Sequence, residues 1–226
     1  LRTLADMVEL AVVKRGLQWF WRRNGNKTSK NIGHIAWTIR CIAVKHLECD
    51  EGTAEVFAEI VGKLKVSTTG LSEKNKKTVA QFSDPKVVSR VLGLPDVLWD
   101  MAIKEGDSKK GCLYAQQAVA IDILIFAPMR LNNLQNLRLD RHINWVGERI
   151  HINVPAEEVK NRENLHFILP RHLSDRIRQY IDRWRDRFVT GPNPHLFPGK
   201  DGKPKDDSTI RRQIKEYCFK HAGVII

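Results

Sequence analysis

The stretch Ala127-Pro128-Met129-Arg130-Leu131-Asn132-Asn133-Leu134 separates two helical patterns of different character. Residues 114–127 are apolar on nearly every side, which predicts a helix buried in the core of a large domain. Pro128 is expected to end that helix. Leucines three residues apart then predict a new helix that has Arg130 among its first residues and exposes Asn132 and Asn133 on its side.

Farther along the chain, helical spacing gives way to alternation. Apolar and polar residues alternate over 150–154 and again over 165–169, which predicts two strands. We expect residues 157–160 and the polar turn 161–164 to complete a small antiparallel sheet.

Helical spacing returns over residues 173–188, which predicts a long amphipathic helix. A loop containing Leu196-Phe197-Pro198-Gly199 follows it. Ser208 is the expected N-cap of a last helix, and Gly223 is its expected stop.

The N-terminal part of the chain reads as a separate helical bundle. Apolar residues recur at helical spacing over 4–20, 35–46 and 53–64, and this periodicity fades before the basic run 73–77. We expect a helical domain over 1–70, a linker over 71–83 and a second domain over 84–226. The fold class is mainly α with a small antiparallel sheet (α+β).

The composition favours a polyanionic partner. The formal charge is +12 and the pI is near 9.7, which suits nucleic acid or an acidic membrane surface. Basic residues exceed acidic ones both before and after Lys77, so a polymer that contacts both domains fits better than a single charged tail. The chain has no stretch of about twenty apolar residues, and its four cysteines, which form no C-x-x-C pair, are expected to be reduced thiols in an intracellular protein.

The order of the motifs from residue 84 to 226 resembles the catalytic domain of the tyrosine recombinases, the phage integrase family. The resemblance rests on residues 127–140, on Val159-Lys160-Asn161-Arg162, on Leu169-Pro170 closing the next strand, and on the Leu-Phe-Pro-Gly loop. It implies site-specific DNA cleavage and rejoining through a phosphotyrosine, with neither metal nor cofactor. The helical domain before it looks like part of a core-binding domain.

The resemblance assigns roles to two residues. Arg130 matches the first catalytic arginine, which holds the non-bridging oxygens of the scissile phosphate; a guanidinium fork suits that task. Lys160 matches the sheet lysine that protonates the departing 5′ oxygen. The plainer alternatives are that Arg130 caps a carbonyl or pairs with an acid, and that Lys160 is an exposed hairpin lysine.

The sequence departs from the family pattern in two places. Asn133 stands where the family usually has a carboxylate that orients the arginine. The family's His-x-x-Arg box, its downstream His or Trp and its nucleophilic tyrosine should follow Gly223, and we expect them beyond Ile226. Tyr114, Tyr180 and Tyr217 are expected to serve core packing, so this chain alone is expected to be inactive. Since Leu1 lies inside a helical pattern, we also expect the N-terminal domain to be incomplete.

The expected partner is duplex DNA, with a tetrameric synapse implied by the family and a location in the bacterial cytoplasm, at the nucleoid. The rival interpretation is a non-catalytic DNA-binding protein derived from a recombinase. The residues expected to contact DNA phosphates are Lys27, Lys30, Lys74, Lys76, Lys77, Arg138 and Arg162.

Overall fold

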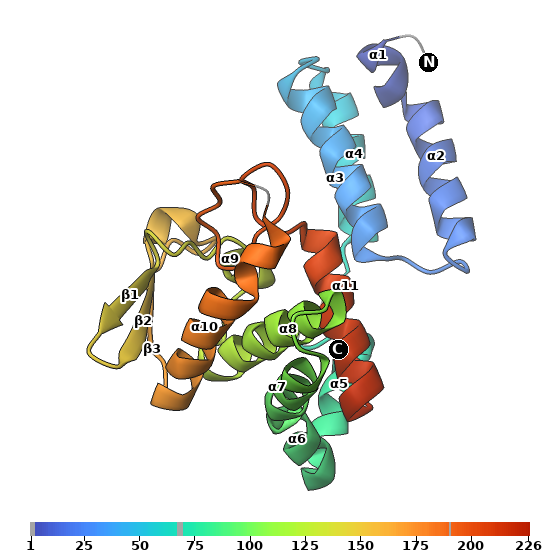
Figure 1. Ribbon diagram of the computed structural model, residues 1–226. Coiled ribbons are helices and arrows are strands. Elements are labelled where there is room, and N and C mark those ends of the chain that lie inside the picture. The colour runs from blue at the N-terminus through green and yellow to red at the C-terminus, as the bar shows by residue number, and fades with distance from the viewer. Residues whose placement is uncertain (1–2, 67–69, 190) are drawn as a thin grey trace. The chain divides into compact units, whose positions relative to one another are not determined.

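The computed structural model describes residues 3–66, 70–189 and 191–226. The chain divides into two compact units, Leu1–Ser72 and Glu73–Ile226 (Figure 1). The described residues are mainly helical and include a three-stranded antiparallel sheet, which confirms the α+β fold class. In the same residues, no helix combines the length and the apolar character needed to cross a bilayer.

The first unit contains α1 (Leu4–Val8), α2 (Leu10–Arg23), α3 (Lys30–Lys45) and α4 (Glu51–Leu64). The side chains of Ser29 and Asp50 accept hydrogen bonds from backbone N–H groups in the first turns of α3 and α4 and so fix where these helices begin. The single helix expected over 4–20 is broken at Glu9, whose ψ of 126° is not helical; no proline or glycine marks this break. The core of the unit consists of Val13, Leu17, Ile32, Ala36, Ala43 and Phe57.

The segment expected to be a linker is largely helical, and from Glu73 onward it belongs to the second unit. It forms α5 (Glu73–Ala80) and the 3₁₀ turn η1 (Gln81–Ser83). No residue of α5 is buried, and Lys76 pairs with Glu73 at 2.7 Å one turn away. The helix therefore lacks the apolar stripe by which a sequence pattern reveals helices.

The core of the second unit surrounds α8 (Lys109–Phe126), which is buried along most of its length. The helices α6 (Pro85–Leu92), α7 (Leu94–Glu105) and α10 (Arg171–Arg183), with the 3₁₀ turn η3 (Arg185–Phe188), complete this part of the unit. Tyr180 and Trp184 are fully buried in this core. Helix α8 matches the buried helix expected from the apolar run before Pro128.

The C-terminal helix α11 (Asp207–Tyr217) continues as a π-helical turn, η4 (Cys218–Ala222). Its N-cap is Asp206, which accepts the Thr209 N–H at 3.0 Å, so the expectation of Ser208 was wrong by two residues. Gly223, with φ of 70°, ends the helix as expected.

The sheet has the order β1-β2-β3, with β1 (Ile143–Val146), β2 (Arg149–Val154) and β3 (Leu165–Ile168). The alternating residues of β2 and β3 form strands as expected. The two strands pair antiparallel, with Val154 opposite Leu165. The expectation that residues 157–160 belong to the sheet was wrong, because Pro155 precedes a 3₁₀ turn, η2 (Ala156–Glu158). The third strand is β1, whose single buried residue, Ile143, gives only a weak alternation signal.

The Leu-Phe-Pro-Gly loop lies against the segment that follows Arg130. Leu196 and Phe197 are fully buried, and the Leu196 N–H donates to the Leu137 carbonyl oxygen at 2.8 Å. A Cβ on Gly199 would lie 2.3 Å from the Pro204 carbonyl oxygen, so only glycine allows this approach. The loop therefore supports the helix that begins after Arg130.

A buried lysine in this loop predicts a pH-dependent stability. Lys205 is 9% exposed, donates to the Gln116 Oε1 and lies over the Phe188 ring. Burial, assisted by Arg212, lowers the pKa of Lys205 to about 8 from its ordinary value of 10.5. Between these values the unfolded chain keeps a proton that the folded chain has released, so the free energy of unfolding rises with pH.

We expect this contribution to reach at most about 3 kcal/mol above the unfolded pKa and to vanish below about pH 8. The measurement is urea unfolding of the wild type and Lys205→Met at about pH 7 and about pH 10. The wild type should gain stability relative to the variant at the higher pH. An unchanged difference between the two proteins would contradict the buried, deprotonating lysine.

Candidate active site

Arg130 is placed by the short helix α9 (Leu131–Gln135), of which it is the N-cap. Its own backbone is extended, with φ of −65° and ψ of 145°, and its carbonyl oxygen accepts the N–H groups of Asn133 and Leu134. Leu134 and Leu137 are fully buried and anchor the helix in the core. Arg130 is exposed, so its guanidinium extends from a fixed backbone into solvent.

The Arg130 side chain reaches the turn between β2 and β3. Its Nη1 donates to Asn161 Oδ1 at 3.0 Å. Asn161 directly follows Lys160, so the structure brings the turn that carries Lys160 and Arg162 to the start of α9. These residues lie about thirty positions apart in sequence, and sequence reasoning had joined them only through the family resemblance.

The turn itself is built from local hydrogen bonds. The Arg162 N–H donates to the Val159 carbonyl oxygen at 2.8 Å, and Val159 is buried. Arg162 has φ of 55°, a left-handed conformation that reverses the chain direction. The side chains of Lys160 and Arg162 are exposed, and no carboxylate of the described residues forms an ion pair with either.

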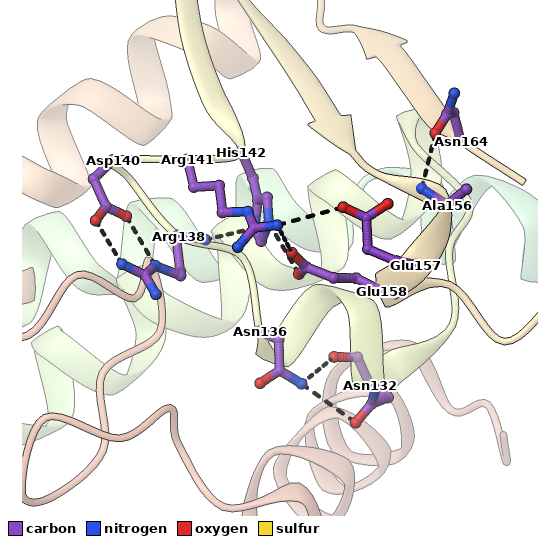
Figure 2. A network of polar contacts seen from close by, with 10 residues as sticks. All are labelled: Asn132, Asn136, Arg138, Asp140, Arg141, His142, Ala156, Glu157, Glu158 and Asn164. Carbon is purple, nitrogen blue, oxygen red and sulfur yellow. Dashed lines mark hydrogen bonds and ion pairs between the residues drawn. The ribbon is translucent and has the colours of Figure 1, made fainter. Parts of the chain in front are cut away.

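A polar network holds both ends of this turn (Figure 2). At one end, Glu158 lies 2.6 Å from Arg141 Nη2 and 3.2 Å from the buried His142 Nε2. Arg141 and Glu158 are at ion-pair distance, and His142 Nε2 lies near the same carboxylate without a hydrogen bond to it. At the other end, Asn164 Oδ1 accepts the Ala156 N–H at 2.8 Å.

His142 has a defined hydrogen-bonding state on one side. Its Nδ1 accepts the Arg138 backbone N–H at 3.1 Å, which leaves the proton on Nε2, the atom that faces Glu158. The network thus ties the segment before β1 to the segment before Lys160. Nothing in the sequence pattern indicated this pairing.

Asn133 does not take the orienting position that a carboxylate holds in the family pattern. It was expected to be exposed but is 5% exposed, because it lies on the side of α9 that faces residues 138–142. Among the described residues its Nδ2 has no hydrogen-bond partner. It lines a pocket of about 390 Å³ together with Asn132, Asn136, Arg138, Arg141, His142, Val154, Glu158 and His195.

The residues expected to contact DNA phosphates are distributed over both units. Lys27 and Lys30 are exposed in the first unit, before α3 and at its first residue. Lys74, Lys76 and Lys77 are exposed on α5. Arg138 is engaged with Asp140 by hydrogen bonds of 2.9 and 2.6 Å, which raise the Arg138 pKa and lower the Asp140 pKa.

The three tyrosines of the chain pack in the second unit. Tyr114 and Tyr180 are buried, and burial raises the pKa of Tyr180 well above its ordinary value. Tyr217 is half-buried, with its ring 5.6 Å from that of Tyr114. The side-chain oxygen of Tyr180 is engaged with Gln116 at 3.1 Å.

Sequence reasoning missed two residues of this site, Asn161 and Glu163. Both were treated as turn formers, although Asn161 contacts Arg130 and also donates to Glu163 Oε2 at 2.7 Å. Their position beside Lys160 was the available signal. No groups of three His, Cys, Asp or Glu side chains suitable for a metal ion occur in the described part of the chain.

The family model described as the Phage integrase family matches residues 101–224. This match spans more than half of the chain, and the protein belongs to the phage integrase family, the tyrosine recombinases. Membership of this family implies DNA binding. Searches of curated proteins and of solved structures gave no match.

Proposed function

We propose that the protein is a site-specific recombinase that cleaves and rejoins duplex DNA through a phosphotyrosine intermediate. The observation that carries this proposal is the contact between Arg130 and Asn161, since it supports one shared site for Arg130 and Lys160. In this proposal unit Leu1–Ser72 is the core-binding domain, the two units contact the same DNA, and copies of the protein assemble on it in the bacterial nucleoid.

The chemistry follows from the charges that develop during phosphoryl transfer. Arg130 donates hydrogen bonds to the non-bridging phosphate oxygens, where negative charge increases in the transition state. Lys160 gives a proton to the 5′ oxygen as its bond to phosphorus breaks, while a tyrosine oxygen forms the new 3′-phosphotyrosine bond. Arg162, exposed in the same turn, contacts a neighbouring phosphate.

We expect this chain to bind duplex DNA with an affinity that falls steeply as salt concentration rises. Basic side chains that neutralise phosphates release condensed counterions, and contact with about six phosphates predicts a loss on the order of 10³ in affinity between about 50 and 200 mM salt. Fluorescence anisotropy with a labelled duplex at several salt concentrations measures this. Binding that is absent at low salt, or indifferent to salt, would refute the DNA-binding proposal.

The matched variants for this experiment are Arg130→Gln and Arg171→Gln. Arg171 pairs with Glu148 in the β1–β2 hairpin, at the end of β2 opposite to the Lys160 turn. Arg130→Gln should reduce the slope of log affinity against log salt by about 1, and Arg171→Gln should leave it unchanged. Equal slopes for Arg130→Gln and the wild type would remove Arg130 from the DNA contacts.

The second candidate function is a non-catalytic DNA-binding protein of the same family. The packing of Tyr114, Tyr180 and Tyr217 favours it for this chain, because a packed tyrosine oxygen is poorly placed to attack a phosphate. A nicked suicide substrate separates the two: a covalent protein–DNA adduct from the full-length gene product supports the recombinase, and its absence supports the DNA-binding protein.

A further inference from the structure

Two hydrogen bonds connect Arg130 to a carboxylate through an amide. Arg130 Nη1 donates to Asn161 Oδ1 at 3.0 Å, and Asn161 Nδ2 donates to Glu163 Oε2 at 2.7 Å. Only this orientation of the Asn161 amide satisfies both neighbours, since guanidinium is donor-only and carboxylate is acceptor-only. Each bond therefore fixes the other.

We infer that Asn161 and Glu163 are positioning residues for Arg130, and that the carboxylate that orients this arginine acts from the β2–β3 turn and not from position 133. The inference rests on the proposed function of Arg130. Asn133 is buried with its Nδ2 unpartnered among the described residues, and the hydrogen bond between positions 133 and 130 joins their backbones. The Asn161–Glu163 pair supplies an acceptor and a negative charge in its place.

The arrangement leaves Arg130 able to bind a phosphate. The bond to Asn161 uses one of the five N–H donors of the guanidinium, so the others remain for phosphate oxygens. The negative charge of Glu163 polarises the Asn161 amide and strengthens its acceptor oxygen without itself occupying the place of the phosphate.

The same turn also carries Lys160. The bond from Arg162 N–H to the Val159 carbonyl oxygen closes the turn around Lys160 and Asn161, and Asn164 holds its far end through Ala156. The turn that carries Lys160 consequently also holds the guanidinium of Arg130, whose backbone is fixed by α9, so a change at Asn161 alters the direction of the guanidinium relative to Lys160.

The test uses this chain without DNA and measures rotation about the Cζ–Nε bond of Arg130 by NMR, with the signals assigned by Arg130→Lys. In Asn161→Ala we expect the rotation to become about fivefold faster, the effect of losing one hydrogen bond. Asn164→Ala is the control, because it loosens the same turn without touching Arg130. Equal rates in the wild type and Asn161→Ala would overturn the inference, as would equal acceleration by both variants.

A charge exchange separates positioning from general loosening of the turn. Asn161→Asp places two carboxylates side by side, and should disturb the turn and shift the Arg130 signals. Adding Glu163→Gln lets the new amide donate to Asp at position 161, which accepts from Arg130 in a charge-assisted hydrogen bond, so Arg130 in the double variant should rotate no faster than in the wild type. If Arg130 rotates as fast in the double variant as in Asn161→Asp alone, the relay through Asn161 and Glu163 would be contradicted.

Titration with a short DNA duplex tests the positioning role of Asn161 separately from the phosphate-binding role of Arg130. If duplex DNA shifts the Arg130 signals but Asn161→Ala leaves the rotation rate unchanged, the phosphate-binding role stands and the positioning role is wrong. If Asn161→Ala frees Arg130 but duplex DNA never perturbs it, the relay exists and the proposed function of Arg130 is wrong.

Discussion

Replacing Arg130 with alanine is expected to slow strand cleavage by at least about a hundredfold, because it removes a transition-state contact worth on the order of 3 kcal/mol. The guanidinium extends from the N-cap of α9 and meets the Lys160 turn through Asn161. In the proposed reaction its hydrogen bonds to phosphate strengthen as charge develops, so we expect the loss to fall chiefly on the rate and less on DNA affinity. The measurement is the rate of covalent adduct formation by the full-length gene product on a nicked substrate that carries its recombination site.

Two variants show whether the effect is specific. Arg130→Lys keeps the charge but loses the planar fork, and should remain strongly impaired. Arg171→Ala, at the opposite end of the sheet, should cleave at nearly the wild-type rate. An Arg130→Ala protein that cleaves at full rate would exclude Arg130 from the active site.

Replacing Arg176 with methionine is expected to destabilise the second unit by about 3 to 5 kcal/mol, since it leaves a buried carboxylate without its partner. Arg176 on α10 bonds to Asp122 on α8 and to Asp96 on α7, and its guanidinium lies 5.5 Å from the centre of the Trp99 ring. Asp122 is 3% exposed; burial raises its pKa, and Arg176 opposes that shift. Urea unfolding followed by tryptophan fluorescence measures the loss.

The double variant Arg176→Met/Asp122→Leu is the control for this prediction. It removes both charges, and replacing a whole buried pair with apolar side chains is often nearly neutral, so most of the lost stability should return. If the double variant is as unstable as Arg176→Met, the loss comes from packing around Trp99 and not from an isolated charge.

Most of the helices predicted from the sequence have a buried face, although α7, which buries Leu94, Leu98 and Ala102, was not predicted. The apolar run before Pro128 became α8, and the alternating residues became β2 and β3, because each pattern records contact with the core. Helix α5 has no buried residue and β1 has one, so their patterns carried little signal. Glu9, where the first helix breaks, carries no local signal of any kind.

The sequence alone determined the order of the motifs and the basic charge, and its resemblance to the tyrosine recombinases marked Arg130 and Lys160 as candidate residues. Only the tertiary structure decided that Arg130 meets Asn161, that Asn133 is buried and that Glu158 lies beside Arg141 and His142. The residues in these contacts come from separate elements and lie at least 16 positions apart in the sequence; Arg130 and Asn161 are 31 positions apart. They depend on how α9, the segment before β1 and the β2–β3 turn pack on a common core, which no local pattern specifies.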